Sequence, residues 1–279
     1  MKITFFGTTT LLFDDGRDQI FFDCHFTRPS LLKYIAGSEV TDTALADRII
    51  KTHRIDRLKA IFVSHTHHDH VMDAPYIANC TKATIYGSLS AMNVGRGSGV
   101  TEDRLVQFEA GQTYSVGDFR IKVIKSIHSK PTALNNDLGQ EITKPLVQPA
   151  KLRNYKEGGS YDFIVEAQGK TYVIRPSFNY IEGQLDGIKA EYLFLGIAGI
   201  AKADAQTEKR FFEETIEKVK PSLVIPLHWD NFFSPLDKPV RPMPSFVEKT
   251  NVALFKLTSY CSQKGIPTVV QMPLTSIEL

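Results

Sequence analysis

The feature that most constrains this chain is a cluster of histidines directly after an apolar run. Four of the eight histidines lie within six residues, and an aspartate lies among them: His65, His67, His68, Asp69 and His70. Side chains alternate between the two faces of an extended segment, so His65 and His67 point the same way and His68 points away. Asp69 and His70 follow where we expect the chain to turn into a helix. Imidazole and carboxylate groups bind zinc, manganese and iron, so the cluster predicts a metal centre.

The runs around this cluster alternate between strand and helix patterns. Strands are predicted at residues 2–6, 10–13, 19–22, 60–63, 83–86, 105–108, 119–124, 161–166, 171–174, 192–195, 223–227 and 269–272, and helices at 43–52 and 205–220. A last helix is predicted to begin at a capping box of Ser245 and Glu248 and to end at Gly265. Two rounds of strands followed by helices favour an α/β fold over residues 1–279: one four-layer αββα sandwich with two mixed β-sheets flanked by helices.

The segment from about residue 129 to residue 159 differs from the rest of the chain. It is rich in Pro, Asn, Lys and Gly and shows neither a strand period nor a helix period. A loop of this length inside a compact domain usually has a function or is mobile. We therefore expect an insertion that lies over the active site.

Composition narrows the classes of function. Three cysteines without CxxC spacing favour free thiols, a reducing compartment and hence the cytoplasm. The formal net charge of +2 gives no general attraction to nucleic acid or to a membrane. No apolar run approaches the roughly 20 residues that span a bilayer. These features favour a small-molecule substrate and leave self-association open.

The pattern His65-x-His67-x-Asp69-His70 resembles the signature of the metallo-β-lactamase superfamily, and most closely its UlaG-like predicted metal-dependent hydrolases. The strand that ends at Asp23 is similar to an early strand of that family. The resemblance covers nearly the whole chain and implies the metallo-β-lactamase-like αββα fold. It also implies that His128 completes a first metal site with His65 and His67, and that His228 joins Asp69 and His70 in a second.

One departure from the family pattern concerns the number of metal ions. The family usually has a metal-bridging aspartate after the strand at 171–174, but here the chain reads Arg175-Pro176-Ser177, and Ser177 stands nearest that position. A hydroxyl is a weaker ligand than a carboxylate. Either one ion binds the first site and Asp69 is free to act as a base, or a second ion binds weakly. We expect an occupied first site and a second that depends on metal supply, with zinc as the ion and manganese or iron as alternatives.

The resemblance also implies a mechanism and roles for several residues. A bound metal ion would activate water to attack a carbonyl or phosphoryl centre, with Asp69 orienting or deprotonating that water. His228 or His70 would assist the leaving group if it is not a ligand. Asp23 would hold a ligand histidine in one tautomer, or is simply a turn residue.

Four residues near the ends of these strands are candidates for a substrate pocket. Ser177 and Tyr180 follow one strand, and Trp229, the only tryptophan, follows another, although core packing is the alternative for Trp229. Arg175 either binds an anionic group of the substrate or faces solvent.

These residues favour hydrolysis of a small ester, lactone or phosphodiester. A metal-dependent nuclease is the first alternative, and the near-neutral net charge argues against it. The second alternative is a sensor that binds a metal or ligand without turnover, which the missing bridging aspartate keeps open.

Overall fold

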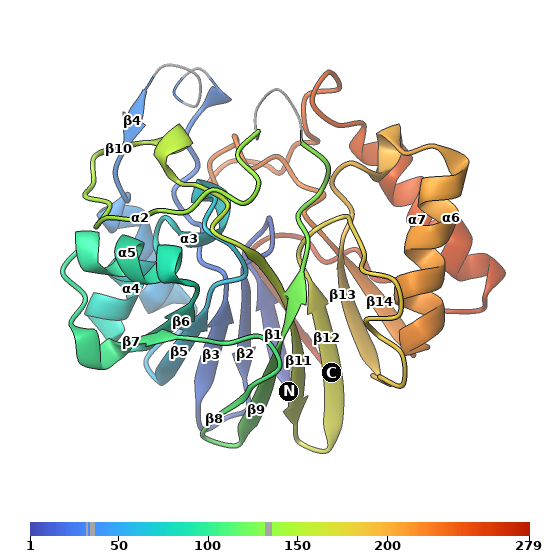
Figure 1. Cartoon of the computed structure of the whole chain (residues 1–279), viewed down its shortest axis with the longest axis horizontal. Coiled ribbons are helices and arrows are strands. Elements are labelled where there is room, and N and C mark those ends of the chain that lie inside the picture. Colours follow the sequence, from blue (N-terminus) through green and yellow to red (C-terminus); the bar gives the residue numbers. More distant parts are fainter. Residues whose placement is uncertain (32, 34–36, 132–135) are drawn as a thin grey trace.

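The computed structural model describes residues 1–31, 33, 37–131 and 136–279. Two β-sheets pack face to face at the centre, and helices cover the outer face of each sheet (Figure 1). The first sheet is covered by α2 (Thr43–Thr52), α4 (Ala74–Thr81) and α5 (Leu89–Gly97), and the second by α6 (Ala205–Phe212) and α7 (Thr250–Gln263). The predicted αββα sandwich is thereby confirmed.

The first sheet has seven strands in the order β15-β1-β2-β3-β5-β6-β7. Its strands are β1 (Lys2–Phe5), β2 (Leu11–Asp14), β3 (Gln19–Phe22), β5 (Leu58–Phe62), β6 (Thr84–Gly87), β7 (Leu105–Gln107) and β15 (Thr275–Glu278). The pairs β15-β1, β1-β2 and β2-β3 are antiparallel, and the pairs from β3 to β7 are parallel. The sheet is therefore mixed, as predicted.

The second sheet has six strands in the order β14-β13-β12-β11-β9-β8. Its strands are β8 (Thr113–Val116), β9 (Phe119–Ser126), β11 (Ser160–Ala167), β12 (Lys170–Arg175), β13 (Tyr192–Gly196) and β14 (Leu223–Leu227). The pairs from β8 to β12 are antiparallel, whereas β12-β13 and β13-β14 are parallel. The carboxyl ends of β12, β13 and β14 therefore lie at one edge of this sheet.

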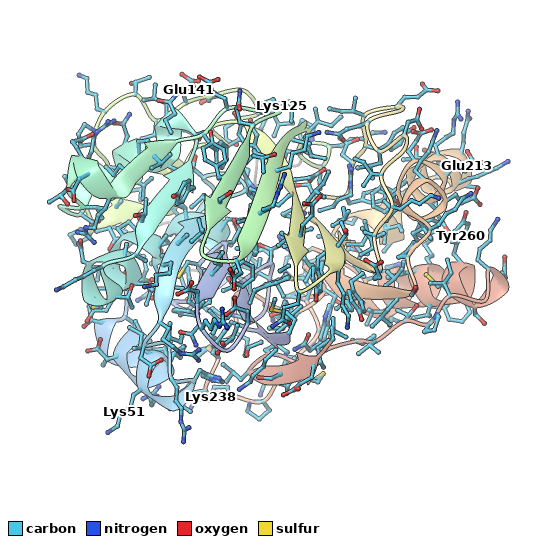
Figure 2. All side chains as sticks on the ribbon, turned by 90° about the horizontal axis from the view of Figure 1, so that it is seen from below. Lys51, Lys125, Glu141, Glu213, Lys238 and Tyr260 are labelled. Carbon is cyan, nitrogen blue, oxygen red and sulfur yellow. The ribbon has the colours of Figure 1, made fainter. Side chains whose placement is uncertain are left out.

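Short elements complete the described part of the chain. They are β4 (Ser38–Glu39) paired with β10 (Ala150–Lys151), α3 (His68–Val71), the 3-10 turns Glu102–Arg104, Leu152–Asn154 and Ile200–Lys202, and the π-helical turn Glu213–Glu217 that continues α6. No helix among the described residues is long and apolar enough to cross a membrane. Charged side chains of both signs project around the outline of the molecule, among them Lys51, Lys125, Glu213 and Lys238 (Figure 2).

The core explains why the first sheet holds its register. In β3, Ile20 and Phe22 belong to the apolar cluster between the two sheets, while Phe21 belongs to the cluster beneath the helices. Phe22 meets Phe163 of β11 with their ring centroids 5.2 Å apart. A fully buried phenylalanine contributes about 1.5–3 kcal/mol relative to an exposed one, and a slip of one residue would exchange the two faces. The register of the first sheet is therefore fixed, and so is the position at which each of its strands ends.

Two predictions about the C-terminal region are wrong. The last helix begins at Thr250 rather than at a capping box of Ser245 and Glu248, because the Glu248 carboxylate accepts from the backbone N–H of Gly199 at 2.6 Å instead. The closing strand is Thr275–Glu278 rather than residues 269–272. Pro273 has no N–H to donate to a sheet ladder, and the chain joins β1 only after it.

Candidate metal centre

Three strands deliver the candidate ligands to one edge of the sandwich. The segment after β5 carries His65 and His67 and then α3, while His128 follows β9 and His228 follows β14. His228 has a positive φ of 58°, an unfavourable conformation for a residue other than glycine. Its N–H donates to Thr8 O at 2.6 Å, which ties this bend to the first sheet. All the strongest candidate ligands therefore come from rigid strand ends.

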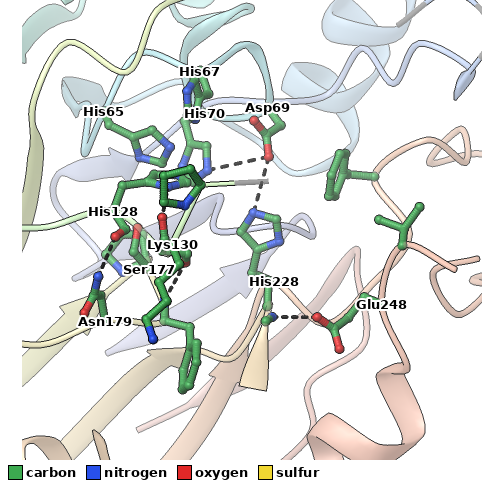
Figure 3. Close-up of a pocket in the computed structure, with 18 of the residues that line it drawn as sticks. His65, His67, Asp69, His70, His128, Lys130, Ser177, Asn179, His228 and Glu248 are labelled. Carbon is green, nitrogen blue, oxygen red and sulfur yellow. Dashed lines mark hydrogen bonds and ion pairs between the residues drawn. The ribbon is translucent and has the colours of Figure 1, made fainter. Parts of the chain in front are cut away.

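The side chains gather into two groups (Figure 3). His65, His67 and His128 form the first group, and Asp69, His70 and His228 form the second; each residue offers one ligand atom, and the atoms of a group lie within 4.8 Å of one another. Ligand atoms lie about 2.0–2.2 Å from a zinc ion, so small movements of these side chains would bring each group around one ion. The six residues predicted from the sequence are thus brought together in the two predicted sets.

Hydrogen bonds occupy one ring nitrogen on each of three histidines. His70 Nδ1 lies 2.7 Å from Asp23 Oδ2, His65 Nδ1 lies 3.2 Å from Ser64 Oγ, and His128 Nδ1 lies 3.0 Å from Ser129 O. In each case the outer nitrogen, Nε2, remains as the metal donor. Such partners fix the tautomer and the ring orientation of a ligand histidine.

Two buried ring nitrogens that lack a hydrogen-bond partner among the described residues bear on whether a metal ion fits the site. In the part of the chain that the structure describes, neither His65 Nε2 nor His228 Nδ1 has a hydrogen-bond partner, although both atoms are buried. An unsatisfied buried polar atom costs about 1–3 kcal/mol, so it needs a partner. His65 Nε2 belongs to a group of three imidazoles at ligand spacing, and a metal ion fits there.

Burial prepares the imidazoles of the first group to bind a cation, and nearby charge keeps Asp69 of the second group ionised. Burial lowers the pKa of His65 well below its ordinary value and lowers that of His128 to about 4, so both imidazoles are neutral at pH 7. Burial opposes ionisation of Asp69, but the charges of His70 and His228 and a bond from His228 outweigh it and hold the Asp69 pKa well below its usual range. Neutral imidazole and ionised carboxylate are the forms that bind metal.

The two groups share one cavity of about 550 Å³. Ser177, Tyr180 and Trp229 line it, as predicted for a pocket, and so do the apolar side chains Phe178, Phe211, Phe232, Phe233 and Met243. The wall thus combines these apolar side chains with the polar side chains of the metal groups. This combination is typical of small-molecule sites.

Comparison with known proteins places this site in a family. A family profile described as the beta-lactamase superfamily domain matches residues 19–229, which include every candidate ligand. The chain belongs to the beta-lactamase superfamily. A UPF0173 metal-dependent hydrolase of Roseiflexus castenholzii is 29% identical over 179 residues, which cover 64% of this chain and 67% of that protein. A UPF0173 protein of Pyrococcus furiosus is 26% identical over 179 residues, covering 64% of this chain and 70% of that one.

Solved structures show the same fold. Igni18, described as a metallo hydrolase from Ignicoccus hospitalis, aligns with a TM-score of 0.60 and 16% identity and covers 100% of this chain and 98% of its own. The family match, the named relatives and the two ligand groups together make this protein a metal-dependent hydrolase of the beta-lactamase superfamily. The narrower resemblance to UlaG-like hydrolases stays a prediction.

The expectation for Arg175 needs correction. Its side chain is 1% exposed and does not line the cavity, so it neither faces solvent nor meets a substrate there. Arg175 Nη1 instead pairs with Asp162 Oδ2 at 3.0 Å, and Nη2 donates to Asn179 O at 2.9 Å. A charge this deeply buried needs such partners, and the sequence pattern alone does not reveal them.

His68 also differs in part from its prediction. It belongs to neither ligand group, as its outward direction implied. It is nevertheless buried and lines the cavity, with its ring edge-on to that of His25 at 5.8 Å. Burial lowers the His68 pKa to about 4, so it is neutral at pH 7. His68 is therefore a packing residue beside the second group.

Three residues that support the site were absent from the sequence-based prediction. Thr9 Oγ1 donates to Asp23 Oδ2 at 2.6 Å, and Asn179 Nδ2 donates to His128 O at 2.7 Å. Asp137, from the aperiodic segment at 129–159, lies 3.0 Å from a ring nitrogen of His67. A carboxylate in a polar loop at no fixed spacing from the histidines carries no local signal of this role.

Described parts of the segment at 129–159 lie beside the cavity. Residues 132–135 fall outside the described residues. In the described remainder, several side chains line the cavity, among them Lys130, Asp137, Arg153 and Lys156. Apart from the short elements β10 and Leu152–Asn154, this remainder has no helix or strand.

Proposed function

We propose that this metal-dependent hydrolase holds one tightly bound zinc ion at His65, His67 and His128 and hydrolyses a small ester, lactone or phosphodiester. The observation that carries the proposal is the group of three converging imidazoles at the end of a cavity, one of which presents a buried nitrogen without a partner. Nitrogen donors dominate both groups, which favours zinc over manganese or iron.

A metal ion bound to His65, His67 and His128 would supply a water of lowered pKa and polarise the scissile group. The protein supplies the remaining chemistry. Asp69 is ionised, and its Oδ2 lies 3.3 Å from His228 Nε2, so it can accept a hydrogen bond from water and orient that water beside this imidazole. Asp23 holds His70 through Nδ1 and is supported by Thr9. These groups orient water and move a proton at one end of the cavity.

A second metal ion, at Asp69, His70 and His228, is proposed to bind more weakly. Ser177 is 7% exposed, lines the cavity and stands where the superfamily usually has a bridging carboxylate. A neutral hydroxyl offers less attraction to a second divalent cation than a carboxylate does. Occupancy of this group would therefore follow the concentration of metal in the cell.

The wall of the cavity supports a substrate with an apolar portion. Phe178 and Phe211 meet with ring centroids 4.5 Å apart, and Phe232 meets Phe233 at the same separation. An acyl or aryl group of the substrate would bury apolar surface against these rings at about 25 cal/mol per Å². Lys130, Arg153 and Lys156 also line the cavity and would accept a negatively charged group in place of Arg175.

A substrate panel tests the function. Purified protein would be assayed with p-nitrophenyl esters of increasing chain length, with lactones and with bis(p-nitrophenyl) phosphate, before chelation, after chelation and after zinc is restored. We expect metal-dependent turnover of at least one class. The nuclease alternative would instead show faster cleavage of RNA or single-stranded DNA, and the sensor alternative would show metal binding with no turnover in any class.

A matched pair of variants tests the apolar wall. Phe232→Ala removes a ring that lines the cavity, whereas Phe246→Ala removes one that is 73% exposed and does not line it. We expect Phe232→Ala to raise the KM for long-chain substrates more than for short-chain ones, and Phe246→Ala to leave both unchanged. Equal effects of the two variants would contradict a role of this wall in binding.

A further inference from the structure

In His67 the ring nitrogen that already has a hydrogen-bond partner is Nε2, whereas in the other two histidines of the first group it is Nδ1. Its Nε2 lies 3.0 Å from Asp137 Oδ1, and both side chains are largely buried, at 11% and 14% exposed. His65 and His128 are instead held through Nδ1 and present Nε2. The bond to Asp137 therefore leaves Nδ1 of His67 as the nitrogen for the metal.

The buried carboxylate of Glu157 holds the loop that carries Asp137 in place. Glu157 is 6% exposed and accepts from Gly139 N at 2.8 Å and from Ser160 Oγ at 2.6 Å. A further bond runs from Gly158 N to Gln140 O at 2.9 Å. Residues 137–140 and 156–160 thus form two limbs of one segment, joined side by side.

The second limb, residues 156–160, is hydrogen-bonded to the loop that carries His65 and His67. Thr66, which stands between two candidate ligands, donates from its N–H to Glu157 O at 2.9 Å, and its hydroxyl donates to Lys156 O. Gly158 has a φ of +67°, and a Cβ at this position would lie 2.5 Å from Thr66 Oγ1 and from Ser90 Cβ. The backbone approach is so close that it requires glycine.

We infer that Asp137 is a positioning residue for His67 that couples docking of the segment at 136–158 to metal binding at the first group. The carboxylate holds the tautomer protonated at Nε2 and turns Nδ1 toward His65 and His128. Because coupling between two equilibria is reciprocal, a metal ion on His67 strengthens docking of the segment as much as docking strengthens metal binding. The inference rests on the proposed metal site and assigns the aperiodic segment a part in it.

The test compares wild type with Asp137→Ala, Asp137→Asn and Glu141→Gln. Glu141 is exposed and lies in the same segment, so Glu141→Gln removes the same charge without touching His67. Zinc affinity would be measured by competition with a chromogenic chelator. We expect Asp137→Ala to weaken the first equivalent about 10–100-fold. We expect Asp137→Asn to have a smaller effect, because its amide oxygen still accepts from Nε2, and Glu141→Gln to have none.

Two further measurements separate positioning from loss of structure. In metal-free protein, ¹⁵N NMR of the imidazoles reports the tautomer, and we expect the His67 population protonated at Nε2 to fall in Asp137→Ala. Hydrogen exchange would show zinc-dependent protection of amides 137–140 and 157–158 in wild type, reduced in Asp137→Ala. Wild-type zinc affinity, tautomer and protection in Asp137→Ala would overturn the inference. Failure of the wild-type protein to bind zinc would instead overturn the proposed function.

Discussion

Asp23 Oδ2 lies 2.7 Å from Nδ1 of His70, and both side chains are 1% exposed. The same carboxylate accepts from Ser64 N at 2.7 Å and from Ser64 Oγ at 2.8 Å. One buried aspartate therefore supports a ligand of the second group and the start of the loop that carries the first. These contacts favour the expected role of Asp23 in holding a ligand histidine over that of a simple turn residue.

Asp23→Ala should weaken zinc binding at both groups. Loss of the partner of His70 should lower affinity at the second group about 10–100-fold. The Ser64 N–H would lose its acceptor in the core, which should cost a further 1–3 kcal/mol or so of stability. Zinc titration and urea unfolding measure the two effects. A drop in stability with unchanged zinc affinity would contradict the positioning role.

Ser177→Asp should tighten the second zinc equivalent. A carboxylate at this position adds an anionic ligand that the chain lacks, and we expect a gain of about tenfold, or about 1.4 kcal/mol. Ser177→Asn is the matched control, because it has the same shape without the charge. Calorimetric titration distinguishes the two equivalents. Equal second affinities in wild type and Ser177→Asp would show that Ser177 does not stand at a bridging position.

Gly158→Ala should destabilise the protein more than Gly169→Ala. Both glycines have a positive φ, of 67° and 72°, so each substitution costs the same strain of about 1–2 kcal/mol. A Cβ at Gly158 would also press on Thr66 and Ser90, whereas nothing lies within 4 Å of one at Gly169. Overpacking adds roughly 1–3 kcal/mol. Urea unfolding at pH 7.5 measures the difference, and equal losses would contradict the close docking of this limb.

Metal-free protein should lose stability on acidification, in part through His25. Burial lowers the pKa of His25 well below its ordinary value, so the folded state binds fewer protons than the unfolded state. A base with a depressed pKa contributes stability that is present above about pH 6.5 and is lost as the pH falls through its folded pKa, with a slope of up to about 1.4 kcal/mol per pH unit.

His25→Gln should therefore flatten the dependence of unfolding free energy on pH between 7 and 5, measured by urea unfolding in excess chelator. His53→Gln is the control, since His53 is only partly buried and its pKa is lowered less strongly. We expect its profile to stay close to that of wild type. A His25→Gln profile parallel to the wild-type profile would show that His25 does not titrate in this way.

Much of the fold follows from local patterns in the sequence. The strand at 60–63, the helix at 43–52 and the long β9 are marked by apolar periodicity, and all three are confirmed. The helices α4 and α5 were not predicted. Both are short, α4 has a proline in its first turn and α5 contains two glycines, so neither shows a strong helical pattern in the sequence.

The candidate site, like the fold, could be predicted from the sequence only in part. The ligand groups were predictable because a short motif and strand-end histidines mark them directly in the sequence. Contacts made across the fold were not: Asp137 meets His67 from 70 positions away, and Asp162 pairs with Arg175 between neighbouring strands. Nothing in the local sequence of Asp137 or Arg175 distinguishes a buried partner from a solvated charge.

Metal content is the most direct test of the central claim. Wild type, His67→Ala and the remote control His53→Ala would be dialysed against a zinc buffer and then analysed for zinc by mass spectrometry. We predict one tightly held equivalent in wild type and in His53→Ala, a second that appears only in excess zinc, and loss of the tight equivalent in His67→Ala. Full zinc content in His67→Ala would contradict the metal site.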